Sequence, residues 1–200
     1  MKEHKKLLIA VLLIVLTAGA AAGTYAYTTR AETAHNIITT ASGVRAEIVE
    51  YAADPEHPGQ LIPYEDPESV MPSETVSKIP VVANSGSTAF YTRMKVVRDI
   101  QLAEGKEGEP SADRIILRYH GADGFNTADW TDGGDGYWYY NKPVTAGQET
   151  APLFDEVAFD GELGDLYQGS TAHVSIQAQA VQSDNNSESP LTAEGWPEAK

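Results

Sequence analysis

The chain has 200 residues, no cysteine and a formal net charge of −15 at pH 7. This length suits one domain with a sizeable core, not two large domains. The acidic charge argues against nucleic acid and anionic membrane surfaces as partners, because both attract basic proteins. The absence of cysteine excludes disulfide bonds, thiolate nucleophiles and cysteine-ligated zinc.

Residues 1–26 have the pattern of a signal peptide. Three lysines near the start precede the apolar stretch Leu7–Ala22 and the small residues that end at Ala26. The pattern predicts an N-terminal signal helix, cleavage between Ala26 and Tyr27, and a mature chain outside the cytoplasm. A retained membrane anchor is the alternative, because no charged residue occurs from Leu7 to Thr29 and about 20 apolar residues span a bilayer.

Polar stretches surround the first clear strand of the mature chain. Residues 27–43 are rich in Thr and Ala, with Ile37 and Ile38 as their only strong apolar residues, so they form either a tail or a peripheral strand. Apolar and polar residues alternate over 44–51, the period of a half-buried strand. Five prolines between Asp54 and Ser73 disfavour a central strand or helix, since each removes a backbone donor. That segment is predicted to be a surface excursion.

The remaining chain predicts further short strands. They cover residues 78–82, 89–99, 114–119, 137–140 and 172–182, with one more inside 144–164. A turn at 84–87 favours a hairpin between the first two. We therefore expect an all-β fold, a jelly-roll or Ig-like β-sandwich of seven or eight strands spanning residues 44–183. Residues 184–200 are predicted to be a flexible acidic tail, in which Trp196 alone indicates docking.

Motifs for catalysis are missing from the sequence. The five histidines do not have the spacing of a metalloprotease helix, and no serine lies in a nucleophile-elbow pattern. Asp129, Asp132 and Asp135 are weak candidates for calcium ligands in a glycine-rich stretch. Tight turns select the same residues, and we favour that interpretation. We predict a non-enzymatic protein with no catalytic residue and no cofactor.

Aromatic residues gather at 137–140, with Trp130 nearby. Successive side chains of a strand point to opposite faces, so Trp138 and Tyr140 share one face. Core and cross-strand packing explains such aromatics. An additional role is a binding surface made of Trp130, Trp138 and Tyr140, which would stack on sugars or on another protomer.

Several segments together resemble the TasA and camelysin family of exported bacterial proteins. The most specific block is 135–143, DGYWYYNKP, followed by Gly147, Thr150, Leu153 and Phe154. Further similarity lies in the signal end 23–26 and in three later blocks: Asn36, Ile38, Gly43, Val44, Ala46 and Ile48; Val81–Gly86 with Ala89, Tyr91, Arg93 and Lys95; and Ala178–Gln182. The similarity covers most of the chain.

The resemblance implies a secreted jelly-roll protein of the cell surface or biofilm matrix, processed by a SipW-type signal peptidase. For TasA-type proteins it also implies fibres in which an N-terminal segment adds a strand to the next subunit. Residues 27–43, with Asn36, Ile37 and Ile38, are the candidate assembly strand, and the expected partner is another copy or a related matrix protein. Two alternatives are a camelysin-like surface metallopeptidase, for which the chain has no recognisable zinc motif, and a monomeric surface binding module.

Overall fold

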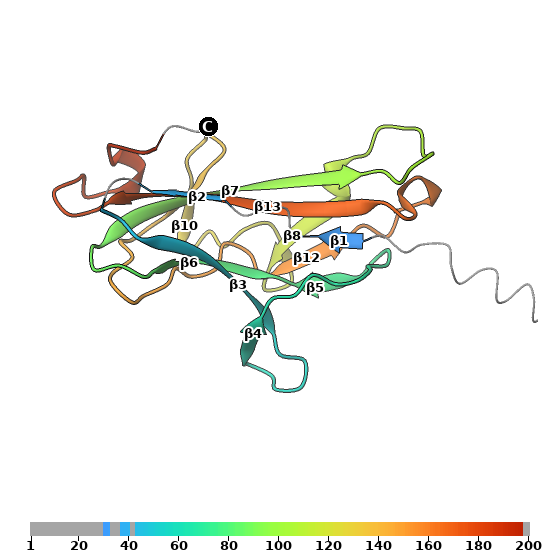
Figure 1. Ribbon diagram of the computed structural model, residues 1–200, viewed down its shortest axis with the longest axis horizontal. Coiled ribbons are helices and arrows are strands. Elements are labelled where there is room, and N and C mark those ends of the chain that lie inside the picture. The colour runs from blue at the N-terminus through green and yellow to red at the C-terminus, as the bar shows by residue number, and fades with distance from the viewer. Residues whose placement is uncertain (1–29, 33–36, 41–42, 198–200) are drawn as a thin grey trace, which may run out of the picture.

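The computed structural model describes residues 30–32, 37–40 and 43–197. The predicted signal helix, its cleavage site at Ala26 and Tyr27, and Asn36 lie outside these residues. The described part is mostly β and contains thirteen strands in three sheets (Figure 1). The expected number of seven or eight is too low, because several additional strands have only two or three residues and show no readable period.

The largest sheet is built around two long strands, β7 (Phe90–Gln101) and β13 (Thr171–Gln182). They pair antiparallel along their whole length, from Thr171 opposite Gln101 to Gln182 opposite Phe90. The order is β1-β13-β7-β11-β10, and β2 also pairs with β13. The shorter members are β1 (Arg30–Glu32), β2 (Ile37–Thr40), β10 (Trp130–Asp132) and β11 (Trp138–Tyr140).

Two smaller sheets contain the other strands. One has the order β5-β12-β8-β9, with β5 at Thr75–Ser77, β8 at Ile115–Tyr119, β9 at Ala122–Asp123 and β12 at Glu156–Phe159. The other has the order β4-β3-β6, with β3 at Ala46–Ala53, β4 at Leu61–Pro63 and β6 at Ile79–Asn84. Two short 3-10 helices, η1 (Ala112–Arg114) and η2 (Asp165–Tyr167), lie in connections between strands, and a third, η3 (Pro190–Thr192), follows β13.

The core lies between the large sheet and the two smaller ones. Met94 of β7 and Ile176 of β13 are fully buried in the same cluster as Ile115 of β8 and Val82 of β6. Figure 1 shows β7 and β13 along one layer and β3, β6 and β12 in the layer below. The alternation predicted for 89–99 and 172–182 is confirmed, since every second residue of these strands faces the core.

The predicted hairpin between 78–82 and 89–99 is wrong. The first segment becomes β6, which pairs with β3, and the second becomes β7, which pairs with β13 and β11. The connection around Ser85 and Gly86 therefore carries the chain from one sheet to another. A turn sequence shows where the chain changes direction but not which strand the next segment will pair with.

The first part of the proline-rich stretch projects from the body as an arm that contains β4 and its connection to the end of β3 (Figure 1). Its one strand, β4, ends at Pro63 and is an edge strand, where a residue without a backbone donor is tolerated. Leu61 and Ile62 are exposed there. The surface position predicted for 54–73 is confirmed over this arm but is wrong at Val70, which is fully buried in the core cluster.

The segment that the sequence predicts to be a flexible tail lies against the large sheet in its described part, residues 184–197. Ala193 and the half-buried Trp196 pack on Tyr91 and Val181, on the sheet face opposite the core. The Tyr91 hydroxyl donates to the Ser187 carbonyl at 3.0 Å. The docking indicated by Trp196 is therefore present.

Candidate functional site

The edge of β13 that faces away from β7 is covered by the N-terminal segment. Arg30–Glu32 of β1 lie opposite Thr171–His173, and Ile37–Thr40 of β2 lie opposite Gln177–Ala180. Both pairings are parallel, whereas the other pairings of the described strands are antiparallel. The predicted assembly residues Ile37 and Ile38 are thus in a strand at a sheet edge, paired within their own chain.

Ile38 connects β2 to the core. Its side chain is half-buried and packs against the core cluster. Ile38 also lines an open groove together with Val44, Ala46, Glu47 and other residues at the start of β3. Its register partner Ala178 is small and buried, so Ile38 lies beside an alanine.

Gly43 connects the N-terminal strand to the domain. Its φ is +87°, a conformation that residues with a side chain rarely adopt, and the position is exposed with open space around it. The chain passes through this residue from β2 in the large sheet to β3 in a smaller one. A glycine at this place supplies both the turn and a backbone position whose dihedral angles change at little cost.

The N-terminal strand β2 shares a much shorter ladder with β13 than β7 does. β2 pairs over four residues, whereas β7 pairs with the same strand over twelve. Half-burial of one isoleucine contributes about 1 kcal/mol, and each net hydrogen bond contributes about 1 kcal/mol. Without β1 and β2, the outer edge of β13 has unpaired backbone groups, which form a template for another strand. The arrangement is therefore suited to strand exchange.

The predicted aromatic binding surface does not form. Trp130 and Tyr140 are buried in the core with ring centroids 5.0 Å apart, so neither ring is available to a ligand. Trp138 is half-buried and packs on Phe125 with centroids 4.9 Å apart. These three residues act in core packing, because the short strands β10 and β11 turn this face of the sheet inward.

The opposite face of β11 carries a second aromatic cluster, which surrounds Arg93. The sequence pattern does not predict this cluster. The Arg93 guanidinium lies 4.2 Å from the Tyr137 ring centroid and 4.7 Å from that of Trp196. It donates to the Gln179 amide oxygen at 2.9 and 2.6 Å and forms an ion pair with Asp135 at 3.0 Å. The alternation of Tyr137 with Trp138 indicates that the strand has two faces. It does not indicate that the C-terminal segment docks on one of them.

The Asp135 carboxylate belongs to this cluster. It accepts from the Tyr139 hydroxyl at 2.8 Å and from the Tyr137 amide at 3.0 Å. Burial raises the pKa of this carboxyl, but the two hydrogen bonds and the charge of Arg93 outweigh burial and leave the pKa below its ordinary value. Asp135 therefore serves as the anionic partner of Arg93.

The other two aspartates of the weak calcium set also have protein partners. Asp129 accepts from the Asn126 amide at 3.2 Å and pairs with Lys142 at 3.4 Å, while Asp132 accepts from the Gly134 amide at 2.9 Å. Across residues 30–32, 37–40 and 43–197, no three His, Asp or Glu side chains come together in a group that could hold a metal ion. The glycine-rich stretch makes turns, the interpretation favoured from the sequence.

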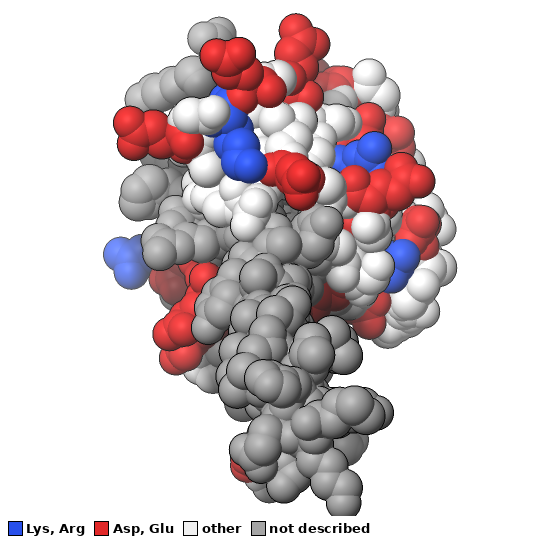
Figure 2. Space-filling view, turned by 90° about the vertical axis from the view of Figure 1, so that its right-hand side faces the viewer, with Lys and Arg blue, Asp and Glu red and all other residues white. Residues whose placement is uncertain are grey.

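The surface is acidic on the end of the molecule that Figure 2 shows. Asp and Glu side chains are spread over the described surface there, with few Lys and Arg between them.

In the described residues, no helix combines the length and the hydropathy needed to cross a bilayer. Comparisons of the chain with protein-family models, with curated proteins and with solved structures gave no match.

Proposed function

We propose that this chain is a secreted, non-catalytic structural protein of the cell surface or biofilm matrix, similar to TasA-type fibre subunits. Its fold is a jelly-roll β-sandwich, and copies assemble by N-terminal strand exchange. The partner is a second copy or a related matrix protein. The observation that carries the proposal is the short, parallel strand β2 at the edge of β13, joined to the domain through Gly43.

Strand exchange needs a strand that makes equivalent contacts in its own chain and in a neighbour. The bonds of Ile37–Thr40 to Gln177–Ala180 are backbone bonds, so they form equally well with the β13 of another copy. Ile38 then packs beside Ala178 of the acceptor. Because each copy has one donor strand and one acceptor edge, the contact is head-to-tail and produces an open fibre where the rotation does not close a ring.

The sequence features agree with an exported matrix subunit. The signal pattern of residues 1–26 predicts export, and the blocks shared with the TasA and camelysin family predict a role outside the cell. The net charge of −15 keeps unassembled copies apart by repulsion and limits uncontrolled association. Assembly then depends on pairing of a specific strand rather than on non-specific association.

Electron microscopy of two purified chains tests the proposal, one beginning at Tyr27 and one beginning at Val44. The longer chain is expected to form fibres, and the shorter chain is expected to remain monomeric, because it has an acceptor edge but no donor strand. A synthetic peptide of residues 27–43 added to the shorter chain is expected to bind it. Fibres of equal number from both chains, with no binding of the peptide, would remove strand exchange as the mechanism.

A further inference from the structure

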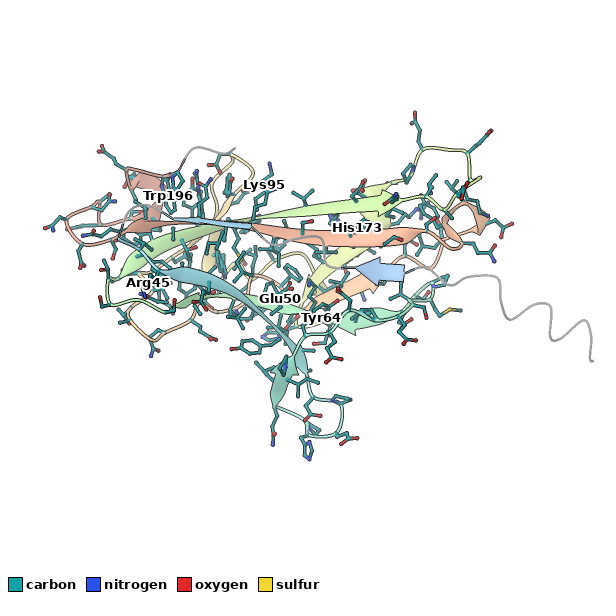
Figure 3. All side chains as sticks on the ribbon, viewed as in Figure 1. Arg45, Glu50, Tyr64, Lys95, His173 and Trp196 are labelled. Atoms are coloured by element: carbon teal, nitrogen blue, oxygen red, sulfur yellow. The ribbon has the colours of Figure 1, made fainter. Side chains whose placement is uncertain are left out.

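Lys78 is the one buried lysine or arginine among the described residues, with 2% of its side chain exposed. It lies between β5 and β6, and its Nζ is 2.5 Å from Oε1 of Glu50 on β3. The same Nζ is 3.9 Å from the centroid of the Tyr64 ring. Figure 3 shows Glu50 and Tyr64 beside each other at the base of the β3–β4 arm.

The backbone fixes these three side chains. Glu50 and Tyr51 pair with Pro80 and Ile79, so the ladder between β3 and β6 ends next to Lys78. The amide of Tyr64 donates to the Glu50 carbonyl at 3.0 Å, and the amide of Lys78 donates to the carbonyl of Asp155 at 3.1 Å. The backbone pairing of the sheet therefore holds Lys78, Glu50 and Tyr64 next to one another, in addition to the contacts between their side chains.

Burial changes the chemistry of the pair. It lowers the pKa of Lys78, although the carboxylates of Glu50 and Asp66 act in the opposite direction. Burial favours the neutral form of the Lys78 amine, compared with the same amine in water. A desolvated lysine amine is a nucleophile, and the Glu50 carboxyl group lies in contact with it.

We propose that Lys78 and Glu50 become joined by an intramolecular amide bond. Nζ of Lys78 bonds to Cδ of Glu50, and the bond from Cδ to one carboxyl oxygen breaks. That oxygen leaves with two of the three ammonium protons as one water molecule. The condensation needs no oxidant, reductant or external co-reactant, because the ammonium and the carboxylate together contain every atom of the amide and of the water.

The site has the two properties that such a condensation requires. Groups held in contact by a rigid frame react with effective concentrations of about 10⁵–10⁸ M, which offsets the unfavourable loss of water in aqueous solution. The Tyr64 ring lies over the Lys78 nitrogen, and the Lys78 side chain is buried, so bulk water has little access to that nitrogen. The side chain of Glu50 is 14% exposed, which leaves a route for the released water.

The bond would give a cysteine-free chain a covalent link between strands. It would join β3 to the start of β6 and close a loop around the proline-rich arm. Closing a loop restricts the unfolded chain, as a disulfide does, and so stabilises the folded state. This inference does not depend on fibre formation, since a monomeric domain would contain the same bond.

Mass spectrometry of the purified chain tests the bond. The peptide that contains Glu50 and the peptide that contains Lys78 are expected in one branched product, lighter than their sum by one water molecule. The Lys78→Arg variant is expected to have its full sequence mass, because a guanidinium does not react in this way. The Lys95→Arg variant is the matched control and is expected to keep the link. Separate linear peptides at full mass from the unchanged chain would overturn the proposal, whatever the variants do.

Discussion

Replacing Trp130 with alanine is expected to lower the free energy of unfolding by about 3–5 kcal/mol, because the change leaves a large cavity. Trp130 has 1% of its side chain exposed and packs on Tyr140. Its indole nitrogen also donates to the Ala151 carbonyl at 3.0 Å, and the truncation leaves that acceptor without this donor. Urea unfolding followed by circular dichroism measures the loss.

Trp138→Ala is the control for that experiment. Trp138 comes from the neighbouring strand and has the same side-chain size, but it is only half-buried beside Phe125. A smaller loss of about 1–2 kcal/mol is expected. If both variants lost the same small amount of unfolding free energy, Trp130 would not be a core residue. The binding-surface role predicted from the sequence would then apply to it again.

Arg93→Ala is expected to release the C-terminal segment and to lower the free energy of unfolding by about 2–4 kcal/mol. The change removes the charge partner of Asp135 and the donors to Gln179. It also removes the cation that lies over the rings of Tyr137 and Trp196. Digestion with a glutamate-specific protease reports the release, because residues 184–197 contain two glutamates.

Lys95→Ala provides a matched control on the same strand. Lys95 lies two residues from Arg93 on the same face, and it forms no salt bridge with the described residues. Its stability and its rate of cleavage are expected to match those of the unchanged chain within about 0.5 kcal/mol. Unchanged cleavage of Arg93→Ala would show that the segment is held without Arg93, by contacts such as the packing of Ala193 and Trp196 and the hydrogen bond from Tyr91 to Ser187.

The long strands could be predicted from the sequence because their period is visible. Over 89–99 and 172–182, one set of alternate residues faces the core, and the opposite set includes Arg93 and Gln179. Sheet membership could not be predicted in the same way. β6 and β7 are separated by a short turn, yet each pairs with a strand far away in the sequence. Such pairings depend on how whole layers pack, and no local pattern contains that information.

The candidate site was predicted in part. Ile37 and Ile38 indicate a peripheral strand because they are the apolar residues in a polar stretch, and the structure gives a strand there. Its partner β13 lies more than a hundred residues away, and the pairing is parallel, so no turn signal connects the two. Trp130 and Tyr140 show the converse problem. An aromatic residue in a strand has the same sequence pattern whether its face is covered or open.

A disulfide trap between two chains tests strand exchange most directly. The chain has no cysteine, so introduced ones are unique. Ile37 and Gln177 are register partners on neighbouring strands. Such partners have Cα atoms about 4.8 Å apart, inside the span of a disulfide. Two chains are mixed under oxidising conditions, a tagged one carrying Ile37→Cys and an untagged one carrying Gln177→Cys.

The account predicts a disulfide-linked pair of one tagged and one untagged chain on a non-reducing gel. A mixture of Ile37→Cys with Ser175→Cys, two residues out of register, is the control and is expected to give little of this product. Fibres that form without any link between Ile37→Cys and Gln177→Cys chains would contradict the account, because β2 would then stay on its own β13 during assembly.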